Sequence, residues 1–205
     1  NANTRAVYGV TYGTNGAGEG LFVAVTERSG VWSSPDGTNW TQRIVDSSSS
    51  DHLYGITFAP DHGFVAVGTA GKVLTSPDGI SWGTNTATSA RLTGITWGYV
   101  TNWDDTVTTN FLAVGYTGTI LTSPDGTNWA SHDSLVTANL SAAAFAPGVG
   151  YIALGAGAVI QYSADGTNWN SSYSDISNPV NVPGNDFKGA VHVGDLGYFV
   201  AVRYY

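Results

Sequence analysis

The sequence contains no cysteine and no methionine, and only 11% of its 205 residues are charged. Without cysteine the chain forms no disulfide bond. Because position 1 is Asn rather than Met, we interpret the chain as a processed product or as part of something longer. No apolar run approaches the roughly 20 residues that a membrane-spanning helix needs, so membrane insertion is not expected.

Positive charge is scarce as well. The chain has seven Lys and Arg residues against 15 Asp and Glu, for a formal net charge of −8, and no two of the basic residues are adjacent. Nucleic-acid binding requires clustered Lys and Arg to neutralise phosphates, so nucleic acid is excluded as a partner. Anionic membrane surfaces are disfavoured for the same reason.

The residues that are abundant favour short strands joined by tight turns. Hydrophobic residues make up 42% of the chain, with 27 Gly, 7 Trp and 11 Tyr. Strong helix formers are few, whereas aromatic and β-branched residues are common in strands and Gly is common in turns. The composition therefore predicts an all-β protein with enough apolar surface to form a core.

One motif recurs four times and determines the predicted architecture. It reads Ser-Pro-Asp-Gly-x-x-Trp, with Ala in place of Pro in the last copy, and its aspartates are 42, 47 and 40 residues apart. The copies span Ser34–Trp40, Ser76–Trp82, Ser123–Trp129 and Ser163–Trp169. A period of about 40–47 residues is typical of a four-stranded propeller blade, whereas a solenoid usually has a shorter period.

Two strand-like segments recur in the same order before each motif, and once more after the last motif. The first segment occurs at Tyr8–Tyr12, Tyr54–Phe58, Thr93–Trp97, Ser141–Phe145 and Lys188–His192. The second occurs at Phe22–Val25, Phe64–Val67, Phe111–Val114, Tyr151–Leu154 and Phe199–Val202. A third strand is expected at Lys72–Thr75 and its counterparts, and a fourth strand is expected to start at each motif Trp.

The prediction is a β-propeller of four-stranded antiparallel blades, with four complete repeats and half of a fifth. It forms a single domain over residues 1–205, either five-bladed or part of a larger propeller. The blades are expected at about 6–46, 52–90, 91–138, 139–185 and, in part, 186–205. Because the last repeat lacks its second hairpin, we expect that hairpin from a continuation of the chain, from self-association or from a partner strand.

The recurring motif has a physical role as a turn. Pro presets φ at the second position of a type I turn, and Ser and Asp side chains can bind nearby backbone amides. We therefore assign a structural role, that of fixing the third and fourth strands as a hairpin, to the Ser, Asp and Trp of each copy. These residues are Ser34, Asp36, Trp40, Ser76, Asp78, Trp82, Ser123, Asp125, Trp129, Ser163, Asp165 and Trp169.

The motif resembles the turn of the Asp-box (BNR) β-propellers, a group that includes sialidases, xyloglucan hydrolases, sorting receptors and photosystem assembly factors. The usual Asp-box reads Ser-x-Asp-x-Gly-x-x-Trp, and in all four copies here one residue between Asp and Gly is absent. The resemblance implies the propeller fold and, in the enzymes of the group, glycosidase activity.

The sequence supplies no set of residues for that activity. The five arginines fall at different points of the repeat, and the only glutamates, Glu19 and Glu27, both lie in the first blade. Glycoside hydrolysis generally needs two carboxylates about 5–10 Å apart. A calcium site needs about six to eight oxygens, and the histidines lack metal-ligand spacing. We therefore predict no catalytic residues, no metal and no cofactor.

The third blade carries an insertion that is the best candidate for ligand binding. Thirteen residues separate Trp97 from Phe111, where three other blades have five. An exposed Trp beside carboxylates and amides is typical of sugar binding. The candidate ligand-binding residues are Tyr99, Asn102, Trp103, Asp104 and Asp105. The alternative is a loop that folds back and buries its Trp.

Together these patterns predict a non-catalytic recognition module that is extracellular or exposed on a virion or cell surface. Glycans are its expected partners, because repeated blades can present several similar shallow sites. One alternative is a structural domain of a phage, virion or filament protein. A second alternative is a relative of the Asp-box glycoside hydrolases.

Overall fold

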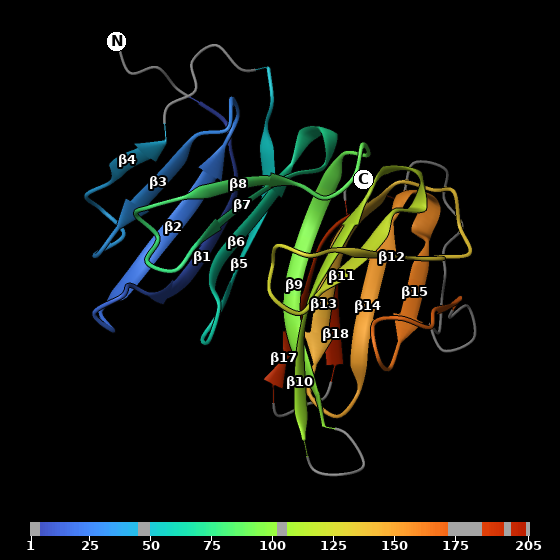
Figure 1. The fold of residues 1–205 in the computed structure, drawn as a ribbon. Coiled ribbons are helices and arrows are strands. Elements are labelled where there is room, and N and C mark those ends of the chain that lie inside the picture. Colours follow the sequence, from blue (N-terminus) through green and yellow to red (C-terminus); the bar gives the residue numbers. More distant parts are fainter. Residues whose placement is uncertain (1–4, 45–49, 102–105, 172–185, 195–197, 204–205) are drawn as a thin grey trace. The chain divides into compact units, whose positions relative to one another are not determined.

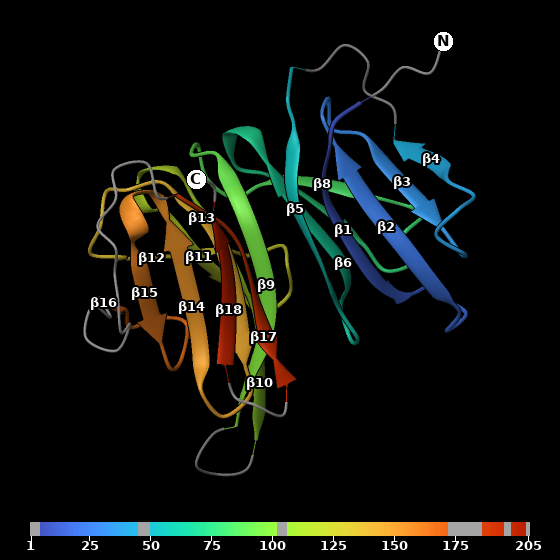
Figure 2. The ribbon, with the colours of Figure 1, turned by 180° about the vertical axis from the view of Figure 1, so that it is seen from behind.

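A computed structural model describes residues 5–44, 50–101, 106–171, 186–194 and 198–203. The chain divides into two compact units, Asn1–Leu92 and Thr93–Tyr205. Each unit consists of antiparallel sheets whose strands follow one another in sequence order (Figures 1 and 2).

The first unit contains two four-stranded sheets, ordered β1-β2-β3-β4 and β5-β6-β7-β8. The strands of the first sheet are β1 Val7–Thr14, β2 Gly20–Thr26, β3 Val31–Ser34 and β4 Thr41–Ile44. Those of the second are β5 Leu53–Ala59, β6 Gly63–Gly68, β7 Lys72–Ser76 and β8 Gly83–Thr86.

The second unit contains two four-stranded sheets and one two-stranded sheet. The third sheet comprises β9 Leu92–Thr101, β10 Val107–Gly115, β11 Ile120–Ser123 and β12 Ala130–His132. The fourth comprises β13 Leu140–Ala146, β14 Gly150–Gly155, β15 Ile160–Ser163 and β16 Asn170–Ser171. The two-stranded sheet pairs β17 Phe187–Val193 with β18 Tyr198–Arg203.

The strand order confirms the predicted four-stranded repeat, and each predicted first and second strand lies inside an observed strand. One detail of the prediction was wrong. The fourth strand of each sheet begins one residue after the motif Trp, at Thr41, Gly83, Ala130 and Asn170. The Trp still belongs to the turn, where three of the four indole N–H groups donate to a turn carbonyl.

The pairing of the first two strands repeats in register, including one bulge. In the second sheet Leu53 lies opposite Gly68, and after the bulge Gly55 lies opposite Val67. The fourth sheet repeats this arrangement, and in the two-stranded sheet Phe187 lies opposite Arg203 before the same bulge. Residues at equivalent positions in different sheets can therefore be compared directly.

Short 3-10 turns connect the second and third strands of three sheets. They are η1 Thr69–Gly71, η2 Tyr116–Gly118 and η3 Ala156–Ala158. Each follows a fully extended glycine, and the central residue of each adopts positive φ, as at Ala70 with φ of 51°. The repeat therefore extends to the loops as well as the strands.

The core lies between neighbouring sheets within each unit. All six residues of β6 and all six of β14 are buried, so both faces of these second strands are covered. In the first unit the core joins the first two sheets through Leu21, Val23, Val25, Val31, Leu53, Ile56, Phe64, Ala66 and Leu74. In the second unit one core cluster comprises Leu112, Val114, Ile120, Leu140, Tyr151, Ala153 and Trp169.

The insertion in the third repeat mainly lengthens a hairpin. β9 has ten residues and β10 has nine, whereas the corresponding strands of the fourth sheet have seven and six. The hairpin is visible in Figure 1 as the long green pair of strands. It places Tyr99, near the end of β9, at the end of the strand next to the inserted residues.

Burial predicts different roles for the motif tryptophans. Trp169 is 5% exposed within a core cluster, whereas Trp40 is 37% exposed. Trp169→Ala should therefore lower the free energy of unfolding by about 3–5 kcal/mol, as expected for loss of a buried large side chain. Trp40→Ala should cost less, about 2 kcal/mol, because less apolar area returns to water. Urea denaturation measures both, and equal losses would contradict the assignment.

Candidate functional site

We use "aspartate turns" for Ser34–Trp40, Ser76–Trp82, Ser123–Trp129 and Ser163–Trp169. In the fourth turn Ser163 Oγ donates to Asp165 Oδ1 at 2.9 Å and accepts the N–H of Gly166 at 2.8 Å. Asp165 Oδ1 also accepts the N–H groups of Thr167 and Asn168, at 2.8 and 2.9 Å. The other three turns repeat these hydrogen bonds.

Two further hydrogen bonds close three of the four turns. In the fourth turn Asn168 Nδ2 donates to Asp165 Oδ2 at 2.8 Å, and Trp169 Nε1 donates to the carbonyl of Gly166 at 3.0 Å. The first and third turns contain the same pair of bonds. The second turn differs, because Ser81 replaces Asn and the buried Trp82 Nε1 has no hydrogen-bond partner among the described residues.

The four turn carboxylates are held in the ionised form. At Asp36 the backbone and side-chain amides of Asn39 lower the pKa far below its ordinary value, and at Asp78 the amides of Ser81 and Ile80 lower it. At Asp125 and Asp165 burial raises the pKa, but amide hydrogen bonds outweigh burial and the pKa again lies far below its usual range. Hydrogen bonds to the charged form are the shared cause.

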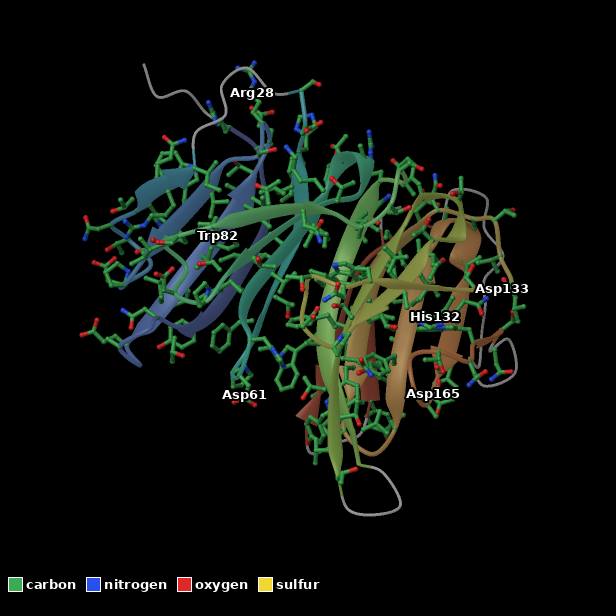
Figure 3. All side chains as sticks on the ribbon, in the orientation of Figure 1. Arg28, Asp61, Trp82, His132, Asp133 and Asp165 are labelled. Carbon is green, nitrogen blue, oxygen red and sulfur yellow. The ribbon has the colours of Figure 1, made fainter. Side chains whose placement is uncertain are left out.

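One histidine lies close to a turn carboxylate. His132 Nε2 is 2.6 Å from Thr122 Oγ1, and the residue is half-buried. Figure 3 labels His132 and Asp165. Burial lowers the pKa of His132, while the nearby negative charge of Asp165 raises it, and burial is the larger effect. The neutral imidazole therefore serves as a hydrogen-bonding group between β12 and β11.

The turn carboxylates are each committed to their own turn. Each is occupied by amides of its own turn, and a carboxylate that already accepts several N–H groups is a poor candidate for acid–base catalysis. Among the described residues there is no group of three or more His, Asp or Glu side chains placed to hold a metal ion.

A cavity in the second unit lies beside Tyr99 and is called here the Tyr99 pocket. Its volume is about 230 Å³, and its lining residues are Tyr99, Val100, Phe145, Gly148, Val149, Gly150 and Ala164. Tyr99 is 38% exposed, and its ring lies 5.4 Å from that of Phe145 and 6.3 Å from that of Trp97. A partly exposed aromatic ring therefore borders the pocket.

A departure from the repeat contributes to this pocket. Ala164 lies in the fourth aspartate turn at the position where the other three turns have Pro35, Pro77 and Pro124. The facing glycine, Gly150, has φ of 130°, and a Cβ there would lie 2.4 Å from the carbonyl oxygen of Ser163. Glycine thus lets the β13–β14 turn approach the aspartate turn, and the small Ala164 leaves the pocket open.

The structure describes only part of the predicted ligand site. Tyr99 borders the pocket, whereas Asn102, Trp103, Asp104 and Asp105 lie outside the described residues. Sequence reasoning did not identify the other lining residues. The signal was present in the printed sequence, because Ala164 is the one departure from Pro among four motifs.

A second aromatic group, in the first unit, was also missed. The rings of Tyr8 and Tyr54 are 5.1 Å apart, and the ring of His52 lies about 6 Å from each, at 6.0 and 5.9 Å. The guanidinium of Arg91 is 5.2 Å from the centre of the Tyr54 ring, within cation–π range. Tyr8 and Tyr54 occupy the same place in successive repeats, but that shared place does not by itself show that the two rings meet.

Repeated four-stranded antiparallel sheets with this meander order define the fold as a β-propeller. Among solved structures, the chain is similar to YCF48 bound to D1 peptide, with 15% identity and a TM-score of 0.66, over 98% of this chain and 64% of that one. It is also similar to YCF48 from Cyanidioschyzon merolae, with 18% identity and a TM-score of 0.56, over 85% and 61%.

A third similar structure is a chain of apo ctPRC2 in an autoinhibited state, with 11% identity and a TM-score of 0.57. The match covers 98% of this chain and 48% of that one, so the chain spans less than two thirds of the length of all three structures. No family model matches the sequence, and no curated protein matches it. Within the described part of the chain, no helix is long and apolar enough to cross a membrane.

The difference between the aspartate turns predicts a stabilising substitution. Ser81→Asn should supply the missing amide donor to Asp78 and raise the free energy of unfolding by about 0.5–1 kcal/mol, the usual net value of one hydrogen bond. The matched control, Asn168→Ser, should lower it by a similar amount. Chemical denaturation measures both, and the idea fails if Ser81→Asn is neutral while Asn168→Ser is destabilising.

The lowered pKa values predict loss of stability in acid. The folded chain binds fewer protons at these aspartates than the unfolded chain, whose aspartates have a pKa of about 3.9. Their stabilisation is therefore complete above about pH 5 and declines as the pH falls below about 4. In Asp165→Asn the unfolding free energy should change less between pH 5 and pH 3 than in the unmodified protein. Identical pH profiles for the two proteins would rule out Asp165 as a contributor.

Proposed function

We propose that this chain is a non-catalytic recognition module that binds glycans at the Tyr99 pocket. The observation that carries the proposal is a 38% exposed tyrosine ring beside a cavity of about 230 Å³. Sugars present flat apolar faces that stack on aromatic rings, and a rigid ring gives contact area at little cost in conformational entropy.

Backbone geometry supports a small polar ligand at this place. The Gly148–Gly150 turn lines the pocket with little side-chain cover, and an added Cβ at Gly148 would have no atom within 4 Å. The turn is also fixed, because Tyr162 Oη donates to the carbonyl of Val149 at 2.8 Å. A stacking ring opposite a fixed turn suits a ligand with one apolar face and a hydroxyl-bearing edge.

The absence of catalysis is part of the proposal. The turn carboxylates are occupied by their own amides, and Glu19 accepts a hydrogen bond from Asn15 in the first unit. A glycosidase needs one carboxyl group with a raised pKa beside an ionised one, whereas the four turn aspartates all have lowered values. In each aspartate turn the Ser and Asp side chains form hydrogen bonds that fix the turn. This turn is the feature that supports a relationship to the Asp-box propellers.

The proposed setting is extracellular or on the surface of a virion or cell. It is supported by the low content of charged residues and the abundance of aromatic residues and glycine. A glycan-binding role and a surface location are consistent with each other, since complex glycans are found mainly on surfaces.

A peptide is the second candidate ligand. The similar structure of YCF48 was determined with D1 peptide, so a propeller of this fold can carry a bound peptide. The Tyr99 pocket would then hold one apolar or aromatic side chain of the peptide rather than a sugar ring.

Glycan-array binding by the purified chain tests the proposal, with Tyr99→Ala and Ala164→Pro as the informative variants. Tyr99→Ala should reduce binding at least tenfold, the range expected for loss of a stacking ring (about 1.4 kcal/mol). Ala164→Pro should reduce binding by filling the pocket, while stability is kept or increased because three other turns accept Pro at this position.

Tyr116→Ala is the matched control, since Tyr116 is also 38% exposed but lies in the η2 turn. It should bind like the unmodified chain. Binding that survives both Tyr99→Ala and Ala164→Pro would place the ligand elsewhere. A blank array with folded protein would contradict glycan binding, and a peptide library screened with the same variants would then test the second candidate.

A further inference from the structure

Within the described residues, the two-stranded sheet pairs β18 on one side only. In the four-stranded sheets the second strand pairs on both sides, as β14 pairs with β13 and β15. β18 occupies the position of a second strand and pairs with β17, and no strand among the described residues pairs with its other edge. Unpaired edges expose N–H and C=O groups that can accept an added strand.

The residues of this sheet that face β14 are less buried than their equivalents. In the fourth sheet Leu140, Tyr151 and Ala153 are all 0% exposed. Their equivalents by register are Phe187, which is half-buried, Phe199, which is half-buried, and Ala201, which is exposed. The two-stranded sheet therefore has the same backbone pairing as the fourth sheet, but its side chains at these positions are less buried.

An apolar cavity lies where that cover is incomplete. Its volume is about 320 Å³, and it is lined by Ile152, Leu154 and Ile160 of the fourth sheet and by Phe187, Phe199 and Ala201 of the two-stranded sheet. The volume reaches the lower end of the range found for ligand pockets, about 300 Å³. All six lining residues are apolar, so the cavity suits an apolar side chain.

The interface between the first two sheets shows what fills the equivalent place. By register, the cavity residues of the fourth sheet correspond to Val23, Val25 and Val31 of the first sheet. The cavity residues of the two-stranded sheet correspond to Leu53, Phe64 and Ala66 of the second sheet. The same cluster also contains Leu74 of β7, and Trp82 of the following turn packs against it.

The aspartate turn of the added hairpin contributes to the same packing. At Gly79 an added Cβ would lie 2.7 Å from Leu21 and 3.2 Å from Val23, so this turn lies directly on the first sheet. In the second unit Trp169 completes the corresponding cluster. A motif Trp therefore packs at this position in both interfaces, and in the first unit Leu74 of the third strand packs beside it.

We propose that the edge of β18 and the adjoining 320 Å³ cavity form a docking site for a β-hairpin of the same type as β7–β8. The hairpin adds its first strand to the edge of β18. It places an aliphatic side chain, equivalent to Leu74, and a turn Trp, equivalent to Trp82, over the cavity. The backbone bonds supply the edge pairing, and the two side chains supply the specificity.

A synthetic peptide with the sequence of Lys72–Thr86 is the direct probe, labelled with a fluorophore and titrated with the purified chain. Fluorescence anisotropy should show saturable binding. The same peptide carrying serine at the positions of Leu74 and Trp82 should bind at least tenfold more weakly, because it keeps the backbone but loses both apolar groups. Equal binding of the two peptides would overturn the proposal.

Variants of the chain locate the site. Ala201→Trp fills the cavity from the β18 side and should weaken peptide binding at least tenfold, without loss of folding because Ala201 is exposed. Val200→Ser is the matched control, since Val200 is 48% exposed, neighbours Ala201 and lies on the other face of β18. It should leave binding unchanged, and unchanged binding by Ala201→Trp would also overturn the proposal.

Isolated hairpins are only marginally stable, so a linked version ensures that weak association is detected. The Lys72–Thr86 sequence is joined after Tyr205 through a flexible Gly-Ser linker, which raises its effective concentration to the millimolar range. The fusion should melt at a higher temperature than the matched fusion with the two serine substitutions. Equal melting temperatures, together with no saturable binding of the free peptide, would show that no hairpin docks here.

Discussion

The second strand of each repeat is apolar on both faces, and this constraint shapes the fold. The second strand of each repeat alternates an aromatic residue and alanine with two branched aliphatic residues, so neither face is polar. In β6 and β14 all six residues are buried. Such a strand is best covered when its sheet packs against neighbouring sheets, which favours a succession of similar sheets.

The aspartate turns complete this arrangement with hydrogen bonds. Each turn carboxylate gathers the amides that would otherwise remain unpaired at the end of a hairpin, and in three turns the following indole N–H binds a turn carbonyl. The carboxylates are thereby committed to structure. The Tyr99 pocket includes Ala164, which replaces the Pro found in the other three turns. The candidate binding surface therefore depends on positions that vary between repeats rather than on those that are the same in each.

Most of the fold was predictable because the same strand pattern occurs in each repeat, so each copy supports the strand positions inferred from the others. The first and second strands and their order were predicted correctly, and the start of the fourth strand was wrong by one residue because the Trp belongs to the turn. The contact of Tyr8 with His52 and Tyr54 depends on packing between sheets, which spacing along one repeat does not encode. The size of the Tyr99 pocket likewise depends on how closely two turns approach, a distance that no residue pattern specifies.

A bulge recurs at the same pairing step in several sheets, so the hairpins formed by their first and second strands share one register. A gene segment encoding one repeat can be duplicated or lost without changing the register on which its neighbours rely. Such a protein can change its number of blades by recombination and then diversify one turn at a time. Ala164 and the longer β9–β10 hairpin are local differences of this kind between repeats that otherwise share one register.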